Sequence, residues 1–199
     1  MSRKAFRLLV TAALLLAPSV AFAHPGHSEA NSLLAGFVHP FSGIDHLLAM
    51  TAVGLFAAHL GGRALWAVPV TFVAVMALGG ILGAAGVSLP FTETAIALSV
   101  LVFGLVIFSG MTPPALAAMA LVGSFAIFHG YAHGTEMPVA GSGIVFGVGF
   151  IVATALLHGF GIALGLAIGR FDEMPRRRAM QACGVAIGLI GVGLTVGLV

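Results

Sequence analysis

Residues 64–86 read ALWAVPVTFVAVMALGGILGAAG and contain no charged side chain. A helix needs about 20 mostly apolar residues to cross the hydrocarbon core of a bilayer, so this stretch predicts a membrane-spanning helix. Comparable stretches recur along the whole chain of 199 residues, which is 60% hydrophobic and only 7% charged. Its mean hydropathy is +1.16, whereas soluble domains are only about 45–50% apolar. The sequence therefore predicts an all-α, polytopic membrane protein with one compact membrane domain.

Glycine, proline and charged residues divide the chain beyond residue 32 into six apolar spans. We expect these spans near residues 33–60, 64–86, 92–110, 114–134, 142–169 and 179–198. Each is close to the length of about 20 residues that a bilayer requires, and the connections between them are short. The predicted domain is thus a bundle of six transmembrane helices over residues 33–199.

The first 23 residues have the pattern of a cleavable signal peptide. A positive start, a short apolar run and an A-x-A cleavage site at residues 21–23 follow one another. Cleavage would leave residues 24–32 as a periplasmic N-terminal arm; an uncleaved first membrane helix is the alternative. Cleavage also removes three of the 8 basic residues, which leaves five against six acids and changes the formal net charge from +2 to −1. The basic residues lost are Arg3, Lys4 and Arg7.

The remaining charges predict the orientation of the chain in the membrane. A cleaved signal peptide puts the new N-terminus outside, and six spans then return the C-terminus to the same side. Arg63 and the arginines within residues 170–178 all fall in cytoplasmic loops in this arrangement, as the positive-inside rule expects. We therefore expect a protein of the bacterial inner membrane whose mature termini are both periplasmic.

Glycine is abundant, with 28 copies, and many of them stand four residues apart. Small residues let membrane helices approach closely, so the pattern predicts tight packing within one bundle, with a homo-oligomer as the minor alternative. Two sets of three spans would be related by inversion, and short sequence echoes at His39, His129 and His158 suggest such a repeat.

Two short segments place ionisable side chains inside the apolar spans. Burying such a group in lipid costs about 2.5–3.5 kcal/mol even on the mildest scale, so these residues are expected to face a pathway or a bound ion. Imidazole and carboxylate groups together form the ligand set of a divalent transition metal. The segment HPFSGIDHLLAM (residues 39–50) holds His39, Asp45 and His46, and FHGYAHGTEM (residues 128–137) holds His129, His133 and Glu136.

The spacing of the first segment places its histidines on one helical face. His39, Gly43 and His46 follow the i, i+4, i+7 spacing of a helix. Pro40 restricts His39 to an extended or helix-start conformation. Asp45 either binds a metal directly or orients a neighbouring imidazole.

The second segment repeats this spacing, with His129, His133 and Glu136 at i, i+4 and i+7 on the predicted fourth helix. The expected topology places both segments at a similar depth on the periplasmic side. We therefore expect them to form one composite metal site, with Gly130 and Gly134 allowing close approach of another helix.

Five further residues are secondary candidates for metal contact. His158 and Met50 are candidate relay ligands, with core packing as the alternative for each. His59 is interpreted as an interface residue rather than an exit ligand. His24 and His27 on the N-terminal arm are candidates for loose metal capture, against the alternative of a disordered tail.

Several other functions find no support in the sequence. The chain has no GxxxxGK[ST] phosphate-binding loop, and its charge does not favour nucleic-acid binding. Its single cysteine excludes an intramolecular disulfide and a CxxC motif. No catalytic residue is predicted.

The two segments resemble the motifs of the HupE/UreJ family of membrane proteins, which are associated with hydrogenase and urease maturation. The family pattern HPxxGxDHxxxM is matched from His39 to Met50, and FHGxAHGxE is matched from Phe128 to Glu136. The resemblance implies permease activity for nickel, or sometimes cobalt. It assigns the metal-binding role to His39, Asp45, His46, His129, His133 and Glu136. The first motif is also similar to the HxxxxDH signature of larger nickel/cobalt transporters, although five residues separate His39 from Asp45 here.

We therefore expect an inner-membrane permease that carries Ni²⁺, or Co²⁺, as its substrate from the periplasm to the cytoplasm. Its partners are the metal ion and the lipid bilayer, without nucleic acid or nucleotide. Protonation of histidine competes with metal, so uptake should fall as the external pH drops through about 6.5. The alternatives are an intramembrane metalloenzyme resembling a zinc hydrolase and a membrane metal sensor or chaperone.

Overall fold

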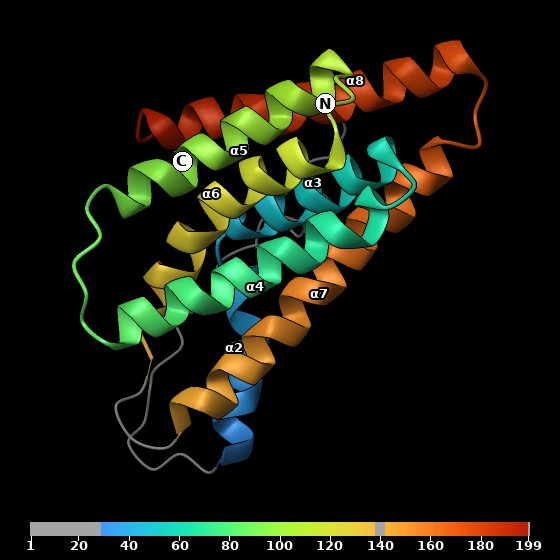
Figure 1. Cartoon of the computed structure of the whole chain (residues 1–199). Coiled ribbons are helices and arrows are strands. Elements are labelled where there is room, and N and C mark those ends of the chain that lie inside the picture. Colours follow the sequence, from blue (N-terminus) through green and yellow to red (C-terminus); the bar gives the residue numbers. More distant parts are fainter. Residues whose placement is uncertain (1–28, 138–141, 199) are drawn as a thin grey trace, which may run out of the picture.

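The computed structural model describes residues 29–137 and 142–198 (Figure 1). The predicted signal peptide and the candidate capture residues His24 and His27 lie outside this part of the chain. The described residues form helices and no strands, which confirms the all-α prediction. The helices are α2 (Glu29–Ser42), α3 (Ile44–Leu60), α4 (Ala64–Ala84), α5 (Thr92–Ser109), α6 (Ala115–Thr135), α7 (Ser142–Ile168) and α8 (Glu173–Thr195).

The helices have the length and composition of membrane spans. Five of them, α4 to α8, are each long and apolar enough to cross a bilayer, and the bent pair α2–α3 makes a sixth span if it is counted as one. Large apolar side chains also cover the outer surface of the bundle; Leu116 is 76% exposed and Ile144 is 82% exposed. Because lipid is as apolar as the protein core, such residues need no burial inside the bundle. The prediction of a polytopic helical membrane bundle is confirmed.

The first predicted span is not one continuous helix. It breaks between α2 and α3, whose axes differ by 83°. Gly43 stands at the break in an extended conformation, with φ −104° and ψ 124°. Pro40 lies three residues earlier and lacks the backbone N–H that would continue the helical ladder. The expectation that His39, Gly43 and His46 share the face of one helix was therefore wrong.

The conformation of His39 also differs from the expectation. His39 is helical and lies in the last turn of α2, with Pro40 inside the same helix. The residue before proline is disfavoured in the α region but not excluded from it. Here α2 is held in place by α7, where Gly36 lies against the backbone of Phe146.

Glycines set the closest helix contacts in the bundle. Gly130 on α6 faces the backbone of α4, and Gly79 on α4 faces the backbone of α6 in return. Gly54 on α3 and Gly161 on α7 make the same reciprocal contact between those two helices. The same reciprocal glycine contact thus recurs in the α3–α7 and α4–α6 pairs, as two related sets of three spans would produce.

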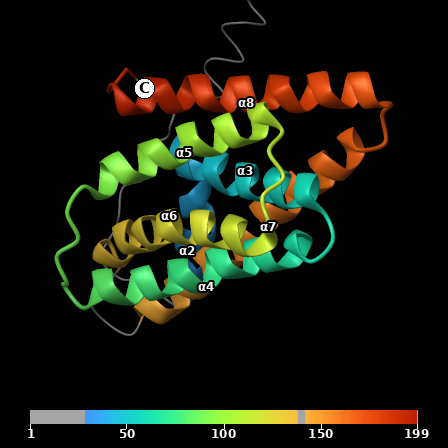
Figure 2. The ribbon, with the colours of Figure 1, turned by 45° about the horizontal axis from the view of Figure 1, so that its top comes forward.

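The helix pairs assemble around a shared interior. Figures 1 and 2 show α8 lying along α5 on one side of the bundle, and α4 beside α6 on another. The long helix α7 packs against both halves of the bent span, α2 and α3. Buried side chains of α3, α4 and α5, among them Phe56, Phe72 and Phe103, fill the interior. After the bend at Gly43, the start of α3 lies next to the end of α6.

Candidate metal site

The end of α6 brings the two histidine segments together. The His133 ring lies beside those of His39 and His46, with centroids 4.7 and 4.3 Å away. His129, one turn earlier on α6, has its ring centroid 4.8 Å from that of His46. Four imidazoles from α2, α3 and α6 thus form one continuous group, which we call the histidine cluster. It consists of His39, His46, His129 and His133.

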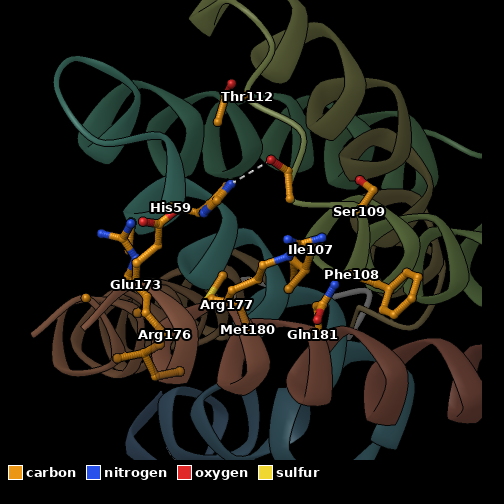
Figure 3. A pocket seen from close by; sticks show the side chains of 15 residues that line it. His59, Ile107, Phe108, Ser109, Thr112, Glu173, Arg176, Arg177, Met180 and Gln181 are labelled. Atoms are coloured by element: carbon orange, nitrogen blue, oxygen red, sulfur yellow. Dashed lines mark hydrogen bonds between the residues drawn. The ribbon is translucent and has the colours of Figure 1, made fainter. Parts of the chain in front are cut away.

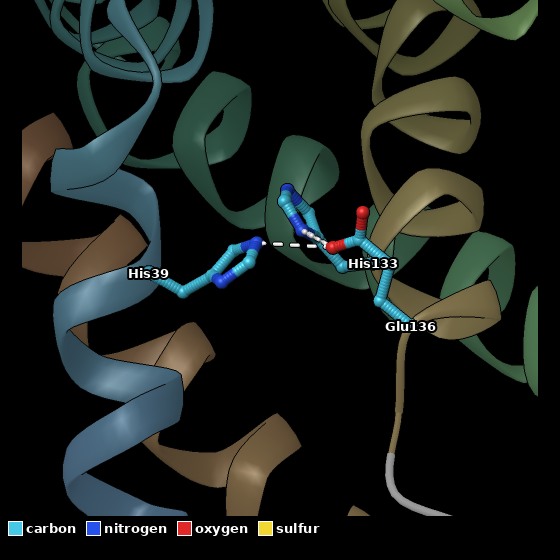
Figure 4. A group of neighbouring side chains, drawn as sticks. All are labelled: His39, His133 and Glu136. Atoms are coloured by element: carbon cyan, nitrogen blue, oxygen red, sulfur yellow. Dashed lines mark ion pairs between the residues drawn. The ribbon is translucent and has the colours of Figure 1, made fainter. Parts of the chain in front are cut away.

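A carboxylate stands next to the outer end of this cluster (Figure 4). Glu136 Oε2 lies 3.2 Å from His39 Nε2 and 3.8 Å from His133 Nδ1. One ligand atom from each of these three residues lies within 4.8 Å of the others. Opposite donors around one ion stand about 4 Å apart when each bond is about 2 Å. A small adjustment of the side chains would therefore allow these donors to surround a cation.

The Glu136 carboxyl, just beyond the last residue of the α6 span, is held in its charged form. Its interaction with the His133 imidazole is the main cause that lowers its pKa, and its partial burial acts in the opposite direction. Charge on nearby His39 lowers the pKa further. Glu136 therefore presents a negative charge at the mouth of the cluster at neutral pH.

Exposure is greatest at the outer end of this row of donors and lowest at its inner end. The side chain of Glu136 is 60% exposed and that of His39 is 35% exposed. His133 and His46 are buried, and His129 has no exposed surface. The donors therefore lead from the surface of the protein into its core.

Asp45 is paired with His46. Its Oδ1 atom accepts a hydrogen bond from the His46 backbone N–H at 2.7 Å and lies 2.8 Å from His46 Nδ1. A carboxylate accepts hydrogen bonds only, so Nδ1 carries the proton and donates it. The other ring nitrogen, Nε2, is buried without a hydrogen-bond partner in the described structure. In the neutral ring, the lone pair of His46 is therefore on Nε2.

Gly43 makes room for this pairing. A methyl group at its Cα would lie 2.5 Å from Asp45 Oδ1 and 3.3 Å from His46 Nδ1. Any larger residue at the α2–α3 break would therefore push the carboxylate away from the imidazole. Gly43 thus has a steric role that its position in the sequence motif did not reveal.

The sequence reasoning did not single out Ser99, which touches the cluster from α5. Its Oγ atom lies 2.9 Å from His129 Nε2, and both residues are fully buried. The available signal was an isolated hydroxyl within the apolar stretch AIALSVLVFGL, residues 95–105. The helix α5, for which the sequence predicted no metal-binding residue, thus contacts a candidate ligand.

Phenylalanine rings pack against the cluster, and one of them links it to a further histidine, His158. Phe150 on α7 lies 4.1 Å from the His133 ring, measured between centroids. Phe72 on α4 contacts both His129, at 5.7 Å, and His158, at 5.2 Å. His158 on α7 is 2% exposed, and neither of its ring nitrogens has a hydrogen-bond partner among the described residues.

The remaining candidates, Met50 and His59, are not members of the histidine cluster. Met50 is fully buried in the apolar core. His59 is at the opposite end of α3 from His46, and its Nε2 atom lies 3.2 Å from the Gly110 carbonyl oxygen. His59 lines a cavity of about 540 Å³ together with Glu173 and Arg176 of α8. Figure 3 shows these side chains. None of the six candidate ligands lines this cavity.

The family model of HupE / UreJ proteins matches residues 12–194 of the chain. The protein belongs to the HupE/UreJ family. It is also 47% identical over 191 residues to Protein HupE of Rhizobium leguminosarum bv. viciae, which covers 96% of this chain and 98% of that relative. No solved structure matches the chain.

Membership in the HupE/UreJ family defines the functional class. The family consists of membrane proteins that serve hydrogenase or urease as nickel or cobalt transporters. The resemblance seen in the two motifs is thereby confirmed over nearly the whole chain.

Proposed function

We propose that this protein is an inner-membrane permease that moves Ni²⁺, or Co²⁺, from the periplasm to the cytoplasm through the histidine cluster. The observation that supports this most directly is the decreasing exposure along a continuous row of donors, from Glu136 to His129. A binding site for a resident ion has no need of such a gradient. An ion that crosses a membrane must exchange its water for protein ligands step by step.

The donors suit a transported divalent ion. Imidazole and carboxylate bind Ni²⁺ and Co²⁺ without thiolate, which would hold a soft metal more tightly. A permeation site must bind strongly enough to admit the ion and weakly enough to release it. We assign the first contact to Glu136 and His39, and the later contacts to His133, His46 and His129.

Asp45 acts in this proposal by orienting His46 rather than by binding the ion. Its carboxylate is already hydrogen-bonded to His46 Nδ1, and such a partner fixes the tautomer and direction of a ligating imidazole. This is one of the two roles that the sequence left open for Asp45.

The path inward continues to His158. The Phe72 ring contacts both His129 and His158, so a moderate movement of one aromatic ring would connect them. Met50 lies nearby only as part of the apolar core, and we give it no contact with the ion. From His158 the ion would travel toward the end of the bundle where Arg63 and the arginines of residues 170–178 lie, which we place in the cytoplasm.

The proposal is tested by metal uptake into proteoliposomes. Purified protein is reconstituted into liposomes that contain an entrapped metal-sensitive dye. Ni²⁺, Co²⁺, Zn²⁺ and Cu²⁺ are then added outside the liposomes, one at a time. We expect Ni²⁺ or Co²⁺ to reach the lumen faster than in protein-free liposomes. Stoichiometric binding without uptake of any metal would favour a sensor or chaperone, and metal-dependent turnover of a lipid would favour an enzyme.

Replacing Gly43 by alanine is expected to weaken uptake while leaving the fold intact. The added methyl group meets the end of the flexible Asp45 side chain rather than backbone, so Asp45 can move away and His46 loses its partner. Loss of such a partner typically costs about 10- to 100-fold in metal affinity or activity. The apparent KM for Ni²⁺ in proteoliposomes measures the effect. Uptake by Gly43→Ala equal to that of the wild type would show that the Asp45–His46 pairing is not needed.

Replacing Glu136 by glutamine is expected to lower uptake equally at every pH between about 5 and 8. The lowered pKa keeps the Glu136 carboxylate charged throughout this range, because its charge is lost only when the pH falls below that pKa. Any decline in wild-type uptake between about pH 8 and pH 5 must then come from protonation of imidazole ligands. Initial rates of Ni²⁺ uptake at a series of external pH values provide the measurement.

A pH profile that flattens in Glu136→Gln would assign the titration to the carboxylate and contradict this assignment. Wild-type uptake that stays constant between about pH 8 and pH 5 would show that no imidazole on the path of the ion becomes protonated in this range.

A further inference from the structure

Ser99 is a fully buried hydroxyl between its own helix, α5, and His129 on α6. Its Oγ atom lies 2.6 Å from the carbonyl oxygen of Ile96, one turn earlier on α5, and 2.9 Å from His129 Nε2. A hydroxyl has only one proton to donate, although its oxygen can also accept. The two short contacts therefore require a definite arrangement of protons.

Only one arrangement satisfies every buried donor. If Ser99 donates to the Ile96 carbonyl, its oxygen accepts the Nε2–H of His129, and Nδ1 carries a lone pair. If Ser99 instead donates to Nε2, the imidazole proton moves to Nδ1, which is buried without a partner in the described structure. A buried donor without an acceptor loses its hydration and gains nothing in return. The contacts thus favour the Nε2–H tautomer of His129.

His46 also has one ring nitrogen anchored by a hydrogen bond, but in His46 the anchored nitrogen is Nδ1 rather than Nε2. Asp45 holds the proton of His46 on Nδ1 and leaves Nε2 free. Ser99 holds the proton of His129 on Nε2 and leaves Nδ1 free. Two neighbouring rings, 4.8 Å apart between centroids, therefore each have one anchored nitrogen and one free lone pair.

We propose that Ser99 is a positioning residue that fixes His129 as the Nε2–H tautomer and keeps its Nδ1 lone pair available to the transported cation. This inference rests on the proposed function. Without the hydroxyl, the ring exchanges protons between its nitrogens and rotates more freely, so Ni²⁺ meets a protonated nitrogen in part of the molecules. Binding of the ion weakens, whereas the steps after binding do not involve Ser99.

The tautomer is measured directly by nitrogen NMR. Protein labelled with ¹⁵N-histidine is placed in lipid nanodiscs without metal at a pH where imidazole is neutral, and the His129 signals are assigned by their absence in His129→Gln. Protonated and unprotonated ring nitrogens have well-separated ¹⁵N shifts. We expect a single Nε2–H tautomer in the wild type and a mixture of tautomers in Ser99→Ala.

Uptake kinetics supply the second measurement. Ser99→Ala is expected to raise the apparent KM for Ni²⁺ by about 10- to 100-fold and to leave the maximal rate little changed. Ser124→Ala is the matched control, because the Ser124 hydroxyl makes the same type of bond to a carbonyl one turn earlier, at 2.7 Å from Leu121, but faces outward. The control should keep the wild-type tautomer and the wild-type KM.

The two measurements separate this inference from the proposed function. A His129 ring that is Nδ1–H in the wild type, or a Ser99→Ala protein with unchanged tautomer and unchanged KM, would overturn the role of Ser99. A wild-type protein that moves no metal would instead refute the permease proposal, and the NMR result would still report whether Ser99 controls the tautomer.

Discussion

Replacing His46 by alanine is expected to reduce Ni²⁺ uptake by more than about 10-fold, since even the loss of a residue that only orients a ligand typically costs 10- to 100-fold. His46 lies at the centre of the cluster, between His133 and His129, with centroid distances of 4.3 and 4.8 Å. Its removal interrupts the row of donors in the buried part of the path and leaves the Asp45 carboxylate without its imidazole partner. The initial rate of Ni²⁺ uptake in proteoliposomes measures the effect.

His59→Ala provides the comparison for this experiment. His59 lies on the same helix as His46 but at its opposite end, where its imidazole contacts the Gly110 carbonyl oxygen. We expect this variant to retain most of the wild-type uptake. Undiminished Ni²⁺ uptake by His46→Ala would mean that the ion does not pass through the cluster.

Replacing Gly130 by alanine is expected to cause the largest loss of stability. The new methyl group would overlap the carbonyl oxygen of Met76 and the backbone nitrogen of Gly80 on α4. Backbone cannot move aside as a side-chain end can, so α4 and α6 must separate. Overpacking of this kind costs about 1–3 kcal/mol and sometimes more. His129 is the residue next to Gly130, so the same separation should also disturb the cluster.

Thermal unfolding in detergent measures this prediction. The chain has a single cysteine, Cys183, which is half-buried on α8, so its reaction with a thiol-specific dye on heating reports loss of the fold. Gly123→Ala is the control on the same helix, because its methyl group would meet only methyl groups of Thr71 and Val75 at 3.6 and 3.7 Å. We expect Gly123→Ala to unfold at or above the wild-type temperature, and equal unfolding temperatures for Gly130→Ala and Gly123→Ala would contradict the proposed backbone contact.

Composition and periodicity determined the class of the fold. Stretches such as residues 64–86 are long and uncharged, and hydrocarbon admits such a segment only as a helix or as part of a closed barrel. The expected spans agree with α4 to α8 to within a few residues at most ends, although α8 begins at Glu173, earlier than the expected residue 179. The positions of the spans follow from local information, because each span is defined by its own residues and by the bilayer around them.

The identity of the candidate residues also came from the sequence, because ionisable groups are costly in lipid and therefore conspicuous. Their arrangement did not. Helical spacing predicted a shared face for His39 and His46, whereas the chain bends by 83° between them and still brings both rings to His133. Gly43 and Pro40 permit the bend locally, but α2 then packs against α7, a contact between segments far apart in the chain.

The sequence by itself determined that this chain is a helical membrane protein and which of its histidines and acids stand out chemically. Only the tertiary structure decided which nitrogen of the His129 ring is free, because Ser99 anchors this ring from another helix. The physical reason is that the two kinds of information act over different distances along the chain. Hydropathy and helical period describe neighbours along the chain, whereas a hydrogen bond between α5 and α6 exists only after glycines such as Gly130 have fixed the distances between helices.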